Sequence, residues 1–175
     1  MTYAVMMYLD ASSEERIRAI WAAMEAAGVP CELPALGARP HISLTCYEDI
    51  DPQAFEAPLC DFAEVRKPIP LSFSYLGVFP KGIVFLGHTV TGRLIEIHRA
   101  YHEAFAAFRD QAFSLYHPGS WVPHCTLAMN LEQHHLPKAI EIAAQFPLPI
   151  EGRLEGIGMV AFPPTREIVT CELEG

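Results

Sequence analysis

Short runs of apolar and β-branched residues alternate along the chain with segments in which apolar residues recur every three or four positions. The first pattern is typical of strands and the second of amphipathic helices. The runs that predict strands are Tyr3–Leu9, Ile69–Phe79, Ile83–Leu86, Ile150–Phe162 and Arg166–Leu173. The chain therefore predicts a mixed fold in which strands and helices follow one another.

The helical segments carry recognisable start signals. Ser12 and Glu15 have the spacing of a capping box, which predicts a helix beginning there. Thr91 is expected to open another long helix, and shorter ones are predicted over Pro52–Phe62 and Pro137–Phe146. The order strand–helix–strand–helix–strand thus occurs twice.

This repeated order predicts one domain over residues 1–175, with two pseudo-symmetric halves at roughly 1–80 and 81–175. A six-residue phrase recurs within the halves, first as Arg39-Pro40-His41-Ile42-Ser43-Leu44 and then as Val122-Pro123-His124-Cys125-Thr126-Leu127. Alternate residues of a strand share a face, so each His should lie beside the hydroxyl two positions later. We therefore expect two imidazoles and two hydroxyls to line one cleft.

The composition bears on the cellular compartment in which the protein is expected. The chain is 51% hydrophobic, no apolar run has the length of a membrane span, and the N-terminus lacks the pattern of a secretory signal. Its five Cys are scattered without a C-x-x-C pair, which favours reduced thiols and a cytoplasmic location. Alternation turns Cys46 and Cys125 toward the apolar side, as buried structural thiols.

The net charge of −9 argues against tight binding of extended nucleic acid, which usually needs a basic stripe. A small anion remains possible, because the field in a cleft depends on nearby groups. We expect a monomer that binds a small phosphodiester.

The repeated motif could divide acid–base work on a phosphodiester. A neutral imidazole would remove a proton from the attacking hydroxyl or water, and a protonated one would protonate the leaving oxygen. The hydroxyls would donate hydrogen bonds to the phosphate, and the scheme requires no metal and no cofactor. A single His on a strand is usually structural, but duplication of two polar positions on one face favours a site.

These paired phrases, inside repeated strand–helix units, resemble those of the 2H phosphoesterase superfamily and, within it, the 2′-5′ RNA ligase-like branch. The resemblance implies an α+β, duplicated, bilobal fold: two antiparallel β-sheets form a central cleft and helices pack outside. It implies catalytic roles for His41 and His124 and phosphate-binding roles for Ser43 and Thr126. The implied activity is metal-independent opening of 2′,3′-cyclic phosphates or related cyclic or 2′-5′ phosphodiesters.

Two further residues are candidates for the cleft. Tyr47 follows the alternation of His41 and Ser43 and could reach the cleft, although a packing role is an ordinary alternative. Arg39 could supply positive charge, although a solvated surface position is an ordinary alternative. His98 and His102 have an i, i+4 spacing that can bind zinc, but the full H-E-x-x-H pattern is absent and a partly exposed helix face is favoured.

Two other functions stay open. The cleft could hold a phosphorylated ligand or nucleotide without turning it over. Two features leave this alternative open. The chain is acidic, and it reads Ala128-Met129-Asn130 where the branch commonly has an arginine. A metal-dependent hydrolase using several of the 8 His is the third possibility.

Overall fold

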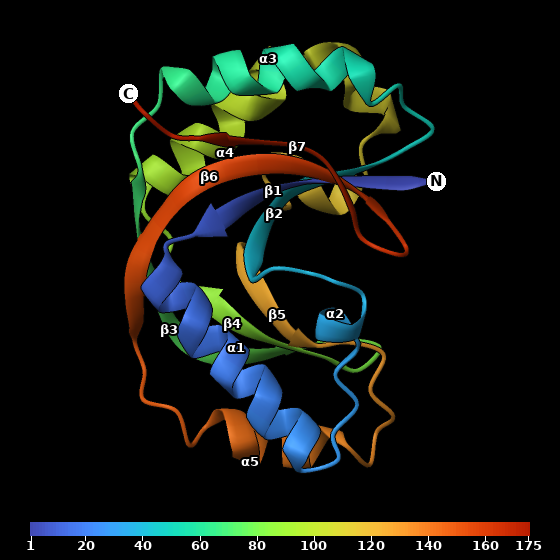
Figure 1. The fold of residues 1–175 in the computed structure, drawn as a ribbon, viewed down its shortest axis with the longest axis vertical. Coiled ribbons are helices and arrows are strands. Elements are labelled where there is room, and N and C mark those ends of the chain that lie inside the picture. Colours follow the sequence, from blue (N-terminus) through green and yellow to red (C-terminus); the bar gives the residue numbers. More distant parts are fainter.

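Seven strands form one continuous antiparallel sheet, with the helices packed outside it (Figure 1). The computed structural model describes all residues 1–175. The strands are β1 Thr2–Leu9, β2 His41–Glu48, β3 Ile69–Phe79, β4 Ile83–His88, β5 His124–Ala128, β6 Ile150–Phe162 and β7 Arg166–Glu172. The helices are α1 Ala11–Ala26, α2 Glu32–Ala35, α3 Gln53–Glu64, α4 Gly92–Ala104 and α5 Leu136–Ala143, with 3-10 turns η1 Ala106–Gln111 and η2 Ser114–Tyr116.

The predicted α+β antiparallel class is confirmed, but the two expected sheets are joined into one. The strand order is β2-β1-β6-β3-β4-β5, with β7 also paired to β6. The joint is β6, whose 13 residues are enough to serve both parts. Its residues 150–154 pair with β3, and its residues 154–162 pair with β1. The two strands that begin with a motif His, β2 and β5, therefore lie at opposite ends of the sheet.

The repeated element order predicted from the sequence is present as β1–α1–β2–α3–β3 followed by β4–α4–β5–α5–β6. The two sequence halves exchange elements. β1, which also pairs with β2, neighbours β6 of the second half, whereas β4, which also pairs with β5, neighbours β3 of the first half. Figure 1 shows α3 and α4 over one end of the molecule and α1 and α5 over the other. We call these ends the first lobe (β1, β2, β7 and the end of β6) and the second lobe (β3, β4, β5).

The main core lies between the sheet and the helices. It contains 39 buried residues, compared with 5 in a second cluster on the opposite face, so the helices cover one face of the sheet only. Helix α1 contributes apolar residues at helical spacing to this core. Ile17, Ile20 and Met24 have no exposed area and pack between α1 and the sheet. Burying each such side chain contributes about 1.5–3 kcal/mol.

Helix α1 begins two residues before the predicted capping box. Asp10 is the N-cap, and its Oδ1 accepts a hydrogen bond from the Ser13 amide at 3.0 Å. The Asp10 carboxylate also accepts from the Arg153 amide on β6. One carboxylate thus caps the helix and also binds the sheet.

The expectation that all thiols are reduced is wrong, because Cys60 on α3 and Cys171 on β7 form a disulfide. The two cysteines are 111 residues apart, and only the packing of α3 against β7 brings them together. Cys31, Cys46 and Cys125 remain free thiols. None of the helices combines the length and the apolar character needed to cross a membrane.

Candidate active site

The two His motifs meet because the sheet curls until its end strands approach each other. His41 is the first residue of β2 and His124 is the first residue of β5. The two strands are in contact and lie side by side at the centre of Figure 1. The Cys125 thiol on β5 lies near the His41 backbone. Residues far apart in sequence thereby share one site.

Each imidazole is held in the same way by the backbone before its motif. His41 Nδ1 lies 2.6 Å from the Arg39 carbonyl oxygen, and His124 Nδ1 lies 2.7 Å from the Val122 carbonyl oxygen. A carbonyl oxygen only accepts, so Nδ1 must carry the proton in both rings. Each Nε2 is then left with a lone pair that can take a proton, or give one back after protonation.

Both imidazoles resist protonation. Burial lowers the pKa of His41, the hydrogen bond to Arg39 partly offsets this, and the nearby charge of His124 lowers it further. Burial also lowers the pKa of His124, offset in part by its bond to Val122. Because the charge on one ring disfavours charge on the other, the pair is suited to hold a single proton.

The motif hydroxyls come from residues on the same face as the His rings. His41 lies opposite Tyr8 of β1, and Ser43 lies opposite Met6, the next inward position of the same strand. Thr126 lies opposite Phe85 of β4. Ser43 therefore shares a sheet face with His41, and Thr126 shares one with His124.

The chain's two tryptophans, which sequence reasoning did not single out, hold these motif strands in reciprocal fashion. Trp121, just before β5, donates from Nε1 to the Ser43 carbonyl oxygen at 2.8 Å. Trp21 of α1 donates from Nε1 to the Thr126 carbonyl oxygen at 3.3 Å. Each half therefore contributes an indole that binds the hydroxyl-bearing residue of the other half's motif.

Aromatic side chains that the sequence analysis also missed flank the second His. Phe79 and Phe85 stack at 4.1 Å between centroids, and their rings contact the His124 ring at 4.9 and 5.2 Å. In the first lobe, the Tyr116 side chain lies near Ser43. The strand patterns were visible in the sequence, but the bulges that decide which residues face inward were not.

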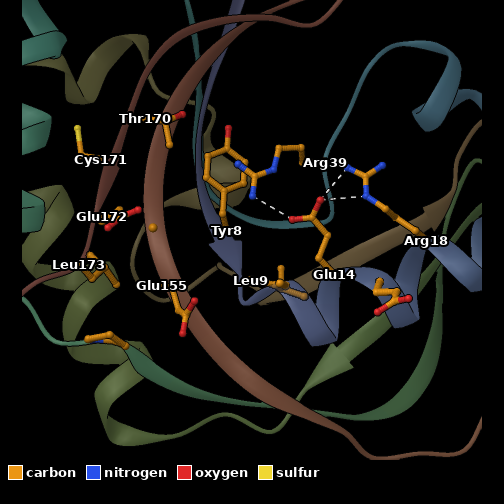
Figure 2. Close-up of a pocket in the computed structure, with 14 residues that line it drawn as sticks. Tyr8, Leu9, Glu14, Arg18, Arg39, Glu155, Thr170, Cys171, Glu172 and Leu173 are labelled. Atoms are coloured by element: carbon orange, nitrogen blue, oxygen red, sulfur yellow. Dashed lines mark hydrogen bonds and ion pairs between the residues drawn. The ribbon is translucent and has the colours of Figure 1, made fainter.

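Arg39 lines a cavity of about 620 Å³ beside the first motif (Figure 2). Its guanidinium lies over the Tyr8 ring, 4.5 Å from the centroid, and its Nη2 binds Glu14 Oε2 at 2.9 Å. Glu14 also binds Arg18 at 2.7 Å. The carboxylate offsets the positive charge that Arg39 was expected to bring to the cleft.

Tyr47 does not share the sheet face of His41 and Ser43, contrary to the alternation used to place it. Its ring is buried in the main core, and its hydroxyl hydrogen-bonds to that of Tyr101 at 2.9 Å. The cause is a bulge at Leu44: Met6 pairs with Ser43 while Val5 pairs with Thr45. One extra residue reverses the faces of all later positions in the strand. The same reversal places Cys46 in the smaller cluster instead of the main core.

His98 and His102 serve packing in this structure. His98 stacks on Trp121 at 4.0 Å with an interplanar angle of 5°, and its Nε2 bonds to the Tyr116 carbonyl oxygen at 2.9 Å. Burial and the neighbouring His102 lower the pKa of His98 to about 4. The structure has no group of three or more His, Cys, Asp or Glu side chains arranged to hold a metal ion.

The fold and the paired motifs agree with a comparison against known families. The sequence profile of the 2′-5′ RNA ligase superfamily matches residues 7–162, most of the chain. The chain belongs to the 2′-5′ RNA ligase superfamily. Its members are 2H phosphoesterases, and membership supports phosphodiesterase-type enzyme chemistry in general.

Solved structures of this superfamily share the fold. TT0787 of Thermus thermophilus is 18% identical with a TM-score of 0.63, covering 100% of this chain and 99% of its own. Escherichia coli LigT, crystallised with 3′-AMP, is 19% identical with a TM-score of 0.62, covering 99% of this chain and 98% of its own. A comparison with curated protein sequences finds no match.

Proposed function

We propose that the protein is a metal-independent phosphodiesterase that opens 2′,3′-cyclic phosphates or related cyclic and 2′-5′ phosphodiesters by acid–base catalysis with two histidines. The observation that carries the proposal is the shared geometry of His41 and His124. Each ring has its Nδ1 proton committed to a backbone carbonyl, which leaves Nε2 for proton transfer. The crystal structure of LigT with 3′-AMP supports a small nucleotide as the kind of ligand.

In the proposed reaction, water attacks phosphorus while the neutral His removes one of its protons through Nε2. The bond from phosphorus to one ring oxygen breaks, and the protonated His gives its proton to that oxygen. The product is a phosphate monoester, and the two histidines have exchanged protonation states. The Ser43 and Thr126 hydroxyls donate hydrogen bonds to the non-bridging oxygens, where negative charge builds.

The substrate is a small diester or an RNA terminus, because a chain with net charge −9 lacks the basic stripe needed for long nucleic acid. We propose that the protein acts without a cofactor and as a monomer. A cytoplasmic location remains part of the proposal, although disulfides such as Cys60–Cys171 are rare in that compartment.

The test is hydrolysis of nucleoside 2′,3′-cyclic phosphates by EDTA-treated protein, with His41→Ala and His124→Ala beside wild type. We expect wild-type turnover and a loss of about a hundredfold or more in either variant, as befits general acid–base groups. Full loss of wild-type activity in chelator, restored by metal, would contradict the proposal.

The acidic charge of the chain favours one alternative, a module that binds a phosphorylated ligand without turnover. It predicts that 3′-AMP binds, that His41→Ala weakens this binding, and that no cyclic or 2′-5′ diester yields product. The same assay, followed by a 3′-AMP titration, separates the two functions.

A further inference from the structure

Tyr75 lies on the same face of the sheet as His124, two strands away. Tyr75 of β3 pairs with Gly87 of β4, and Gly87 pairs with His124 of β5. Residues directly opposite each other in an antiparallel sheet point to the same side. The row Tyr75–Gly87–His124 therefore forms part of the inner surface of the second lobe.

Gly87 lets the Tyr75 ring lie across this row. A Cβ atom added to Gly87 would fall among the ring atoms of Tyr75, so no residue with a side chain fits there without displacing the ring. One face of the ring thus rests on the β4 backbone, in the strand between Tyr75 and His124. The side chain nevertheless remains 46% exposed, which leaves ring surface open to a ligand.

Three other aromatic rings near the two histidines are already engaged. Phe79 and Phe85 stack on each other and contact His124. In the first lobe, Tyr8 is only 4% exposed and its ring is covered by the Arg39 guanidinium (Figure 2). Among these rings, Tyr75 offers the open surface for stacking.

We propose that Tyr75 is a specificity-determining residue whose ring stacks on the nucleobase of the substrate while the phosphodiester lies between His41 and His124. This inference rests on the proposed phosphodiesterase function. Two strand spacings separate Tyr75 from His124, about 10 Å, which a single nucleotide can span. Stacking on an aromatic ring accepts any base, since every base has a π-face. The site therefore selects nucleoside phosphodiesters over aliphatic ones.

The experiment compares adenosine 2′,3′-cyclic phosphate with glycerol 1,2-cyclic phosphate, which has no base. We expect Tyr75→Ala to lower the ratio of kcat/KM values for the two substrates about tenfold, mainly through KM for the nucleotide. Tyr75→Phe keeps the ring and should keep the ratio. Val78→Ala is the matched control, because Val78 is 48% exposed on the opposite face of β3.

The inference is overturned if wild type does not prefer the nucleotide, or if Tyr75→Ala slows both substrates equally. If wild type hydrolyses neither substrate, the proposed function fails and titration with 3′-AMP decides the inference alone. Binding about tenfold weaker in Tyr75→Ala than in Tyr75→Phe would then uphold it. Equal binding by the two variants, or no binding by wild type, would overturn it.

Discussion

Each motif histidine is held by one backbone carbonyl, an arrangement that suits the proposed acid–base role. The bonds from Nδ1 to Arg39 and Val122 orient the rings and select the tautomer that leaves Nε2 free. Without such a partner, an imidazole on a strand could rotate and change tautomer. The repeated residue pattern before each His, ending in Pro, therefore belongs to the site as much as the His itself.

The pKa shifts of the pair determine how activity should depend on pH. Burial lowers the pKa of both rings below the ordinary 6.5, so both are largely neutral above that pH and the general acid is missing. At low enough pH both are protonated and the general base is missing. The form with a single proton, which the reaction needs, is most populated between these limits and below pH 6.5.

At the scale of elements, the reciprocal tryptophan bonds connect the two motif strands. β2 and β5 are end strands, whose outward carbonyls need partners other than a further strand. Trp121 and Trp21 supply two of these partners at Ser43 and Thr126. Because each bond joins opposite halves of the chain, the bonds help to set the distance between the two motifs.

Trp121→Phe should therefore reduce turnover without unfolding the protein. Phenylalanine keeps a ring against His98, which the indole contacts at 4.0 Å, but removes the N–H that binds Ser43. A hydrogen bond contributes about 1 kcal/mol, and small misplacements of reacting groups are costly, so we expect kcat to fall about tenfold with KM little changed.

The control for this variant is Leu115→Ala, which alters a residue 75% exposed in the same segment. Thermal unfolding of both variants should stay close to wild type. An unchanged kcat in folded Trp121→Phe would show that the indole bond has no positioning role.

Element types and their order could be predicted from the sequence because periodicity reports local structure. The strands predicted at Ile69–Phe79 and Ile150–Phe162 have the observed bounds. The sheet face to which each residue points was harder to predict. The bulge at Leu44 reverses the alternation along β2 and moves Tyr47 to the core. Nothing local in the sequence marks such a bulge, since its cause lies in pairing with β1.

The first residue of α1 could not be predicted from the local sequence for the same reason. Ser12 and Asp10 are both acceptable N-caps by residue type. Asp10 is used because its carboxylate also meets the Arg153 amide, which arrives from β6 at the far end of the chain. The tryptophan contacts and Tyr75 were missed for the same reason, since each depends on pairing or packing between distant segments.

On the scale of the whole molecule, exchange of elements makes the two halves interdependent. Each lobe needs a strand from the other half, and β6 belongs to both. The Cys60–Cys171 disulfide adds a covalent link between α3 of the first half and β7 at the end of the chain. The approach of the two motif strands therefore depends on the complete fold.

The Cys60–Cys171 disulfide should be detectable by counting reactive thiols. Under denaturing, non-reducing conditions we expect three reactive thiols, those of Cys31, Cys46 and Cys125, and five after reduction. The disulfide joins two residues that are 111 positions apart in the sequence. Loss of a link of this kind typically lowers the free energy of unfolding by about 2–4 kcal/mol.

Urea unfolding of the double variant Cys60→Ala, Cys171→Ala checks the stability effect, with Cys31→Ala as the control that leaves the disulfide intact. Five reactive thiols before reduction, or equal stability of double variant and control, would contradict the assignment.

The most direct test of two-histidine catalysis is the pH dependence of kcat/KM for wild type, His41→Ala and His124→Ala with a nucleoside 2′,3′-cyclic phosphate. Wild type should give a bell with its maximum below pH 6.5. The variant lacking the general base should keep only the decline at high pH, and the variant lacking the general acid only the decline at low pH. Two variants that keep the full bell, or either one with the wild-type rate, would contradict the account.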